Sequence, residues 1–410
     1  MGSMETSRRN LLKAGTAAAA AVAAAPLTAQ AAVSAENTKF DATYDVVVVG
    51  SGFAGMACAY KAAKAGLSVL MIEKMGVFGG NSAICGGNVA CPVNPVQKAQ
   101  GIKDSKELFI ADCLKDGLGI NHTNLLSTIA DRCNDTIKMV DDCGCEFVPN
   151  KMLFEGGHSV PRSCYLKNGS GSGIVTKQLE ALKKLGVKPR VRCRMEKIIL
   201  NDKGEVEGLE VREGYRFPKK DSGKTKFIKA TKGVILCYGG FAADVKFRMY
   251  QDPKLNETLD TTNQPGATSE MWRETAAIGC LQVQADWIQC GPWGNPKEKG
   301  MGIGWQFNQT AAAEYGIWVN SEGNRFVNEL ANRKVRADAI MVEQAGGKKC
   351  YAICNEPNCA PFKKQRPGFQ DRMLEMKILD KYDTLEALAK GSGIPYENLK
   401  KTVDAFNEAV

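Results

Sequence analysis

The stretch that decides the fold is YDVVVVGSGFAGMACAYKAAKAGLSVLMIE, which spans residues 44–73. Four consecutive valines run into a glycine turn, and such a short apolar run predicts a buried strand. Small residues at 56–65 predict a helix, and the apolar run 67–72 predicts a second strand that ends at the carboxylate of Glu73. Strand, turn, helix and strand in this order predict a parallel βαβ unit.

The turn between the first strand and the helix has the spacing G-x-G-x-x-G, formed by Gly50, Gly52 and Gly55. Gly50 permits the tight turn, Gly52 lets the backbone approach a pyrophosphate, and Gly55 lets the helix lie close to the sheet. The helix N-terminus offers free N–H groups to phosphates, and Glu73 can accept hydrogen bonds from a ribose. Because these signals agree, the sequence predicts an adenine dinucleotide site.

Two further glycine pairs follow the second strand, in FGGNS at 78–82 and CGGN at 85–88. Glycine pairs suit backbone that packs against a large flat ring, where side chains would collide. The alternative is two ordinary loops. The stretch resembles the FAD-binding loop of the fumarate reductase and succinate dehydrogenase flavoprotein family. Within that family, the GPW at 291–293 resembles the urocanate reductase-like members of the soluble flavocytochrome c-type branch.

The resemblance continues over most of residues 44–410. Its later blocks are 192–195 (RCRM), 233–241 (GVILCYGGF), 262–268 (TNQPGAT, followed by Glu270), 319–326 (VNSEGNRF) and 331–334 (ANRK). The resemblance implies FAD as the cofactor. The implied contacts are Gly50, Gly52, Ala54, Gly55, Glu73, Lys74, Gly80, Asn81, Ser82, Gly86, Gly87, Met195, Gly239 and Glu270.

The implied fold is α/β: a Rossmann-like FAD-binding domain at 41–286, with an inserted α+β capping domain at 287–410. Apolar periodicity between these blocks predicts helices at 105–118, 123–140 and 171–185. Short strands are predicted at 190–199, 206–211 and 226–230, with a hairpin turn at 201–204. Members of this family return from the cap to the FAD domain. The sequence stops before such a segment, so we expect the capping domain to be truncated and part of the flavin site to be uncovered.

The resemblance also implies a reaction, the reduction of a carbon–carbon double bond beside a carboxylate. Hydride from the flavin N5 would reach the β-carbon, and the family's active-site arginine, matched by Arg333, would protonate the α-carbon. The family's Thr-Glu pair falls on Asn308 and Gln309, its relay arginine on Ala312, and its substrate histidine on Gly291. Groups suited to a dicarboxylate are therefore missing, so fumarate is not the expected substrate.

A larger or aromatic enoate such as urocanate fits these departures, and Trp293, Asn308 and Gln309 are the candidate substrate contacts. Trp293 could stack on an aromatic ring or could simply belong to the core of the cap. His158 could line the substrate face of the flavin, although a structural role is favoured. Arg162 has the same two alternatives, an anion contact or a structural residue.

The N-terminal residues 1–31 resemble a twin-arginine export signal. Ser7–Lys13 reads SRRNLLK, an alanine-rich stretch follows, and 29–31 (AQA) offers a small-residue cleavage site. The alternative is an amphipathic or disordered N-terminus. No other segment is long and apolar enough to suggest a stable membrane span, so an exported, periplasmic protein is expected.

Composition is that of an ordinary globular protein: 410 residues, 44% hydrophobic, 24% charged and a formal net charge of +9. Basic runs interleaved with aromatic residues are missing, which argues against nucleic-acid binding. The 15 cysteines include neither a C-x-x-C pair nor a haem-attachment motif, so no metal site is predicted. Electrons would therefore come from a separate c-type cytochrome or another periplasmic donor.

Two other functions remain open. One is an FAD-dependent dehydrogenase of the steroid type, which would run the chemistry in the opposite direction. The other is a flavin electron-transfer protein with no organic substrate. Replacing Arg333 separates the last of these from a reductase, since electron transfer alone has no need of a proton-donating arginine.

Overall fold

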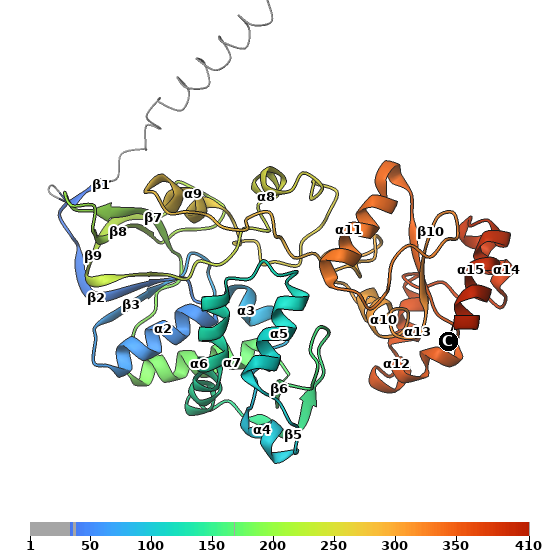
Figure 1. Cartoon of the computed structure of the whole chain (residues 1–410). Helices are drawn as coiled ribbons and strands as arrows, with labels where there is room; N and C mark the ends of the chain where they lie inside the picture. The colour runs from blue at the N-terminus through green and yellow to red at the C-terminus, as the bar shows by residue number, and fades with distance from the viewer. Residues whose placement is uncertain (1–32, 36–37, 168, 410) are drawn as a thin grey trace, which may run out of the picture.

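The computed structural model describes residues 33–35, 38–167 and 169–409 (Figure 1). The export signal predicted at 1–31 lies outside these residues. Within them, no helix combines the length and the apolar character that crossing a bilayer requires.

The βαβ unit predicted at the start of the chain is confirmed. Strand β2 (Ala42–Val49) runs parallel to β3 (Val69–Ile72), and helix α2 (Phe53–Lys64) connects them. The helix begins three residues before its predicted start, because Gly52 already serves as the N-cap residue. Glu73 follows directly after β3, at the carboxyl end of the strand.

Strand β2 is buried on both of its faces. Val46 and Val48 belong to one hydrophobic cluster, while Val47 and Val49 belong to another on the opposite face. Successive side chains of a strand point to opposite faces, so an uninterrupted valine run is what a strand covered on both sides requires. The sheet is therefore the middle layer of this part of the molecule.

The main sheet has six strands in the order β1-β7-β8-β9-β2-β3. Strands β7, β8 and β9 form an antiparallel meander, whereas β9 lies parallel to β2. The predicted turn at 201–204 joins β7 to β8. The additional strands are β1 (Val33–Ser34), β7 (Cys193–Leu200), β8 (Val206–Glu213) and β9 (Lys224–Leu236).

Strand β9 corrects one prediction. The strand predicted at 226–230 and the apolar run at 233–236 form one strand of 13 residues. Both halves pair with β2, through Ala42 with Ile228 and Val46 with Gly233, and the register shifts between them. Pairing with β2 thus continues the strand through residues 231–232, which the prediction left between the two segments.

Helices cover both faces of this sheet (Figure 1). Residues of α2, α6 and α7 pack in the cluster that contains Val46. On the other face, Met271 and Ile278, in and directly after α9, join the cluster that contains Val47. The helices in this part are α3 (Gly80–Ile84), α4 (Pro95–Ala99), α5 (Lys106–Asp116), α6 (Thr123–Asp142), α7 (Gly171–Lys184), α8 (Val245–Gln251) and α9 (Glu270–Ala277).

A small sheet lies beside these helices, with strand order β4-β6-β5. Its strands are β4 (Val89–Ala90), β5 (Phe147–Leu153) and β6 (Ser163–Leu166). Next to β6, Arg162 is fully buried between two carboxylates, with Nη2 2.8 Å from Oδ1 of Asp104 and Nη1 2.6 Å from Oδ2 of Asp112. These contacts use both edges of the guanidinium, so they support the structural alternative for Arg162.

The carboxylate of Asp112 is held ionised by this arrangement. Burial alone would raise the pKa of Asp112, but hydrogen bonds from Ser159 and Arg162 and the charge of Arg162 outweigh burial and lower that pKa. A carboxyl with a lowered pKa stabilises the fold above its unfolded pKa of about 3.9 and loses that contribution as the pH falls through the folded value.

Residues from about 290 onward build their own core (Figure 1, orange to red). One hydrophobic cluster extends from Trp293 to Leu379 and another from Ile317 to Phe406, and neither includes a residue of the main sheet. The elements are α10 (Gly304–Thr310), β10 (Ile317–Asn320), α11 (Arg333–Glu343), η2 (Ala345–Gly347), β11 (Cys350–Ile353), η3 (Pro357–Cys359), α12 (Ala360–Gln365), α13 (Phe369–Glu375), α14 (Leu385–Ser392) and α15 (Tyr396–Ala409). Strands β10 and β11 form an antiparallel pair.

Candidate functional site

A cavity of about 220 Å³ lies where the carboxyl ends of β2 and β3 meet the start of α2. Ligands of open α/β sheets bind at this end of the strands. Eleven of the fourteen predicted cofactor contacts line the cavity: Gly50, Gly52, Ala54, Glu73, Lys74, Gly80, Asn81, Ser82, Met195, Gly239 and Glu270. Residues up to 222 positions apart in the sequence, from Val49 to Met271, are therefore brought to one place.

The N-terminus of α2 faces this cavity with its positive end uncompensated. The first turn contains no acidic residue, and Gly52 provides no capping side chain. The backbone N–H of Phe53 donates to Oγ of Ser82 at 3.0 Å. A helix end of this kind attracts anions, so its donors fit the phosphates of a dinucleotide.

Close packing explains two of the glycines. A Cβ on Gly55 would lie 1.9 Å from the carbonyl oxygen of Gly50, and a Cβ on Gly50 would lie 2.2 Å from the carbonyl oxygen of Cys237. Gly50 also has φ +101°, a conformation that strongly favours glycine. Gly55 is thus not a lining residue, but it allows α2 to lie against the turn that forms the cavity wall.

Replacing Gly55 by alanine is expected to displace α2 and to reduce the amount of FAD that copurifies with the protein. Overpacking of this kind costs about 1–3 kcal/mol, and a contact with backbone has little room to relax. The FAD content per chain and the thermal midpoint measure the effect. The matched control is Gly156→Ala, since a Cβ there has no neighbour within 4 Å, and a Gly55→Ala protein with full FAD content would contradict the expectation.

Glu73 is held in place by Ser51, a residue that the sequence did not single out. Oε2 of Glu73 accepts hydrogen bonds from Oγ of Ser51 at 2.6 Å and from its N–H at 3.3 Å, and Oε1 accepts from the N–H of Met75 at 2.8 Å. Oγ of Ser51 in turn accepts from the N–H of Gly79 at 2.9 Å. The carboxylate is therefore fixed beside the glycine turn, with acceptor capacity remaining for a ribose hydroxyl.

Lys74 and Glu270 meet across the cavity, and Thr268 connects them. Nζ of Lys74 lies 2.5 Å from Oγ1 of Thr268 and 3.3 Å from Oε2 of Glu270, which also accepts a hydrogen bond from Thr268. Burial alone would raise the pKa of Glu270, but Thr268 and the charge of Lys74 outweigh it and lower that pKa. Glu270 is therefore ionised at neutral pH and can accept hydrogen bonds from a bound nucleotide.

Arg194 is a second lining residue that was not predicted, although it lies in the quoted block RCRM. Its guanidinium pairs with both carboxylate oxygens of Glu196, at 2.7 and 2.8 Å, and its Cζ lies 4.3 Å from the ring centre of Tyr215. Met195, the predicted contact, is its neighbour. An arginine fixed in this way presents a rigid cation at the cavity wall.

Gly86 and Gly87 lie outside the cavity lining. Gly87 packs against the start of α7, where a Cβ would lie 2.8 Å from the backbone nitrogen of Gly171. The pair therefore permits a close approach between two segments of backbone. A glycine pair has the same appearance in a sequence whether it accommodates a helix or a flat ring.

Arg333 and Asn308 contact Trp293, and none of the predicted substrate residues lines the cavity. Cζ of Arg333 lies 4.9 Å from the centre of the indole ring, and Nδ2 of Asn308 donates to the carbonyl oxygen of Trp293 at 2.8 Å. Gln309 is half-buried beside Asn308 on α10. The Trp293 residue is only 6% exposed, which leaves little ring surface for a substrate and supports a role in the core of this part.

The loop that contains His158 lies beside Asp116, at the end of α5. A Cβ on the neighbouring Gly157 would lie 2.9 Å from the carboxyl carbon of Asp116, and the backbone oxygen of Asp116 accepts from Nδ2 of Asn332 at 2.5 Å. Burial, aided by the charge of Arg162, lowers the pKa of His158, so the imidazole is neutral at pH 7.

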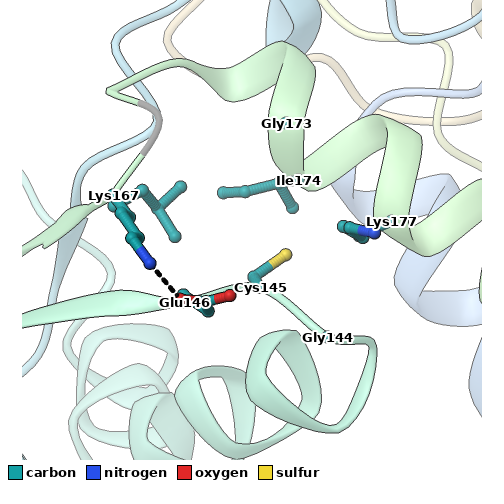
Figure 2. Close-up of a pocket in the computed structure, with 8 residues that line it drawn as sticks. Gly144, Cys145, Glu146, Lys167, Gly173, Ile174 and Lys177 are labelled. Carbon is teal, nitrogen blue, oxygen red and sulfur yellow. Dashed lines mark hydrogen bonds and ion pairs between the residues drawn. The ribbon is translucent and has the colours of Figure 1, made fainter.

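A second hollow of about 250 Å³ lies between α7 and the segment before β5 (Figure 2). Lys167 pairs there with Glu146 at 2.8 Å, and Cys145 points inward between them and Ile174. Burial raises the pKa of Cys145 to about 11, so its thiol is protonated at neutral pH and a poor nucleophile.

A parallel βαβ unit whose glycine turn, helix N-terminus and carboxylate surround one cavity defines a dinucleotide-binding oxidoreductase fold. Residues 45–410 match the family model described as an FAD binding domain. The chain is 39% identical to the acrylate reductase flavoprotein subunit of Shewanella woodyi, over 98% of this chain and 79% of that subunit. It is 32% identical to the urocanate reductase of Eggerthella lenta, over 88% of this chain but only 58% of that enzyme.

Among solved structures, the open conformation of a flavocytochrome c3 fumarate reductase matches with a TM-score of 0.70 and 28% identity, over 90% of this chain and 62% of that one. The chain belongs to the FAD-binding fumarate reductase and succinate dehydrogenase flavoprotein family. It is an oxidoreductase, and the cavity built around Gly52, Ser82 and Glu73 fits the FAD that the family binds.

Proposed function

We propose that this protein reduces the carbon–carbon double bond of an α,β-unsaturated carboxylate and takes its electrons from a separate c-type cytochrome or another periplasmic donor. Relatives named acrylate reductase and urocanate reductase support this reaction class. The predicted twin-arginine signal at 1–31 supports export, since this route carries proteins that have already folded around their cofactor.

One observation carries the proposal, namely the position of Arg333. It is the first residue of α11, and its neighbour Asn332 contacts Asp116 at the end of α5. Helix α11 is thus on the side of its unit that faces the FAD-binding part (Figure 1). We place the domain boundary near residue 287, because the hydrophobic clusters divide close to it.

The chemistry divides between the cofactor and the chain. FAD, when bound, supplies the hydride. Arg333 would bind the substrate carboxylate, balance the negative charge that develops on it and donate a proton to the α-carbon. Closing residues 287–410 over the substrate would exclude water and align the double bond.

Arginine is always protonated in proteins, so Arg333 can act as an acid only if its proton is replaced. The family's relay positions hold Asn308, Gln309 and the fully buried Ala312 here, and none of these side chains can ionise. Arg333 itself is exposed, so water can return the proton between turnovers.

A monocarboxylic enoate is the substrate that these residues favour. Gly291 replaces the histidine that the family uses for its substrate, which removes one cation suited to a second carboxylate. The expectation of an aromatic substrate depended on stacking between the substrate and Trp293. Because the indole ring of Trp293 is buried, that expectation loses its main support. A small acid of the acrylate type therefore fits better than urocanate.

The test is turnover with a chemically reduced viologen dye and a panel of acrylate, urocanate and fumarate. Acrylate is expected to oxidise the dye fastest and fumarate slowest, while saturated propionate gives no reaction. A protein with full FAD content that oxidises the dye with none of the three would refute a reductase. Reduction of an oxidised dye by saturated acids or steroids would instead indicate a dehydrogenase.

A further inference from the structure

Helix α11 begins with two arginines that form no ion pair with a carboxylate of the described residues. Arg333 and Arg336 are the first and fourth residues of the helix, and residues three apart are neighbours on one helix face. Among the residues that the structure describes, neither arginine forms an ion pair. Arg336 is only 8% exposed, and its Nη1 donates to the backbone oxygen of Glu329 at 2.8 Å. Within the same described residues, its Nε has no hydrogen-bond partner.

This arrangement is unfavourable without a ligand, for three separate reasons. A helix N-terminus carries partial positive charge, so cations in the first turn oppose the dipole, and that turn contains no acidic residue. The two guanidinium groups repel each other. Burying a charge without an ion-pair partner is costly. Burial, followed by the charge of Arg333, lowers the pKa of Arg336 and outweighs the opposing charge of Asp116.

An anion bound at this position would remove all three penalties at once. Indole rings form the surrounding walls: Cζ of Arg336 lies 5.6 Å from the ring centres of both Trp293 and Trp318. Cation–π contacts of this kind fix the guanidinium planes. Apolar walls also keep water away, so the attraction between the arginines and an anion is stronger than it would be in solvent.

The ring of Trp293 also explains why the second cation beside Arg333 is provided by helix α11 and not by position 291. A Cβ on Gly291 would lie 3.1 Å from the indole of Trp293. A side chain at position 291 would therefore press against that ring, whereas Arg336 approaches the ring from α11.

We propose that Arg336 is a second carboxylate-binding residue, which together with Arg333 holds one carboxylate of the substrate at the N-terminus of α11. This inference rests on the proposed function, since Arg333 is taken as the substrate arginine. Both guanidinium groups lie against the ring of Trp293, at 4.9 and 5.6 Å from its centre, and the nearby Trp293 and Asn308 carry no charge. The site is therefore built for a monocarboxylate.

The test measures binding separately from turnover. Propionate, which has the carboxylate but no double bond, is titrated into the full chain by calorimetry, and KM and kcat for acrylate are measured in parallel. Arg336→Met is expected to weaken propionate binding and to raise KM by about 10- to 100-fold, which is the loss of a hydrogen-bonded charge. The value of kcat should change much less. Arg336→Lys should recover part of the binding.

A matched control is Arg372→Met, which removes an exposed arginine on α13. If Arg336→Met fails to fold, Arg336→Gln replaces it, because an amide can still donate to the oxygen of Glu329. Unchanged propionate binding in a folded variant would show that Arg336 does not bind the carboxylate. It would not contradict the proposed reductase activity. If the wild-type protein binds propionate but reduces no enoate, the proposed reductase function is wrong. The proposal that the two arginines bind a carboxylate would not be contradicted by that result.

Discussion

Arg333→Ala is expected to lower the rate of enoate reduction by about 10²- to 10⁴-fold, the range that a positioned proton donor contributes. The loss has two causes, because the variant removes both the acid and a cation that binds the substrate carboxylate. FAD content should stay unchanged, since Arg333 does not line the FAD cavity. Steady-state turnover with a reduced viologen dye and acrylate measures the effect.

Arg333→Lys keeps the charge but loses the planar donor geometry, so it should recover binding better than turnover. Arg372→Ala, on the exposed face of α13, controls for the loss of any arginine in this region. A protein that only transfers electrons would pass them from donor to acceptor equally well without Arg333. Unimpaired acrylate turnover in Arg333→Ala would show that another group supplies the proton.

Arg162→Met is expected to destabilise the fold by about 3–5 kcal/mol, the usual cost of removing one partner from a buried ion pair. It would leave the carboxylates of Asp104 and Asp112 buried, with side-chain exposures of 0% and 8%, without their counter-ion. Thermal unfolding followed by circular dichroism, with matched FAD content, should show a clearly lowered midpoint.

The control is Arg132→Met, because Arg132 pairs with Asp135 at 2.6 Å while both side chains are more than half exposed. Exposed pairs contribute at most about 1 kcal/mol, so its midpoint should barely move. Adding Asp104→Asn and Asp112→Asn to Arg162→Met removes the unpaired charges and should restore part of the stability. Equal midpoints for Arg162→Met and Arg132→Met would contradict the structural role of the cluster.

The start of the fold could be predicted because its signals are local. The glycine turn at Gly50 and the burial of Val46 and Val47 on opposite faces of the sheet follow from neighbouring residues alone. The prediction divided strand β9 into two segments, at 226–230 and from 233 onward. Only its pairing with β2, more than 180 residues earlier in the chain, shows that the two segments are one strand.

The cofactor site was predictable where a motif carries its own geometry, as with Gly52 and Glu73. Contacts between distant segments were missed, such as Thr268, which reaches Lys74 across 194 positions. No local pattern marks Arg336 either. Arg336 contacts Trp318 and the backbone of Glu329. These residues belong to other segments of the chain and meet Arg336 only when those segments pack together.

The division of the hydrophobic clusters near residue 290 has a mechanical consequence. Polar contacts join the two parts, as in the ion pair of Lys254 with Asp338 at 3.2 Å and the hydrogen bond from the N–H of Gly300 to Asp260 at 2.5 Å. A hinge motion between the two parts would replace these polar contacts by hydrogen bonds to water. The hydrophobic core of each part would stay intact. Since exposed charges are screened by salt, ionic strength should shift the balance between open and closed forms more readily than it shifts unfolding.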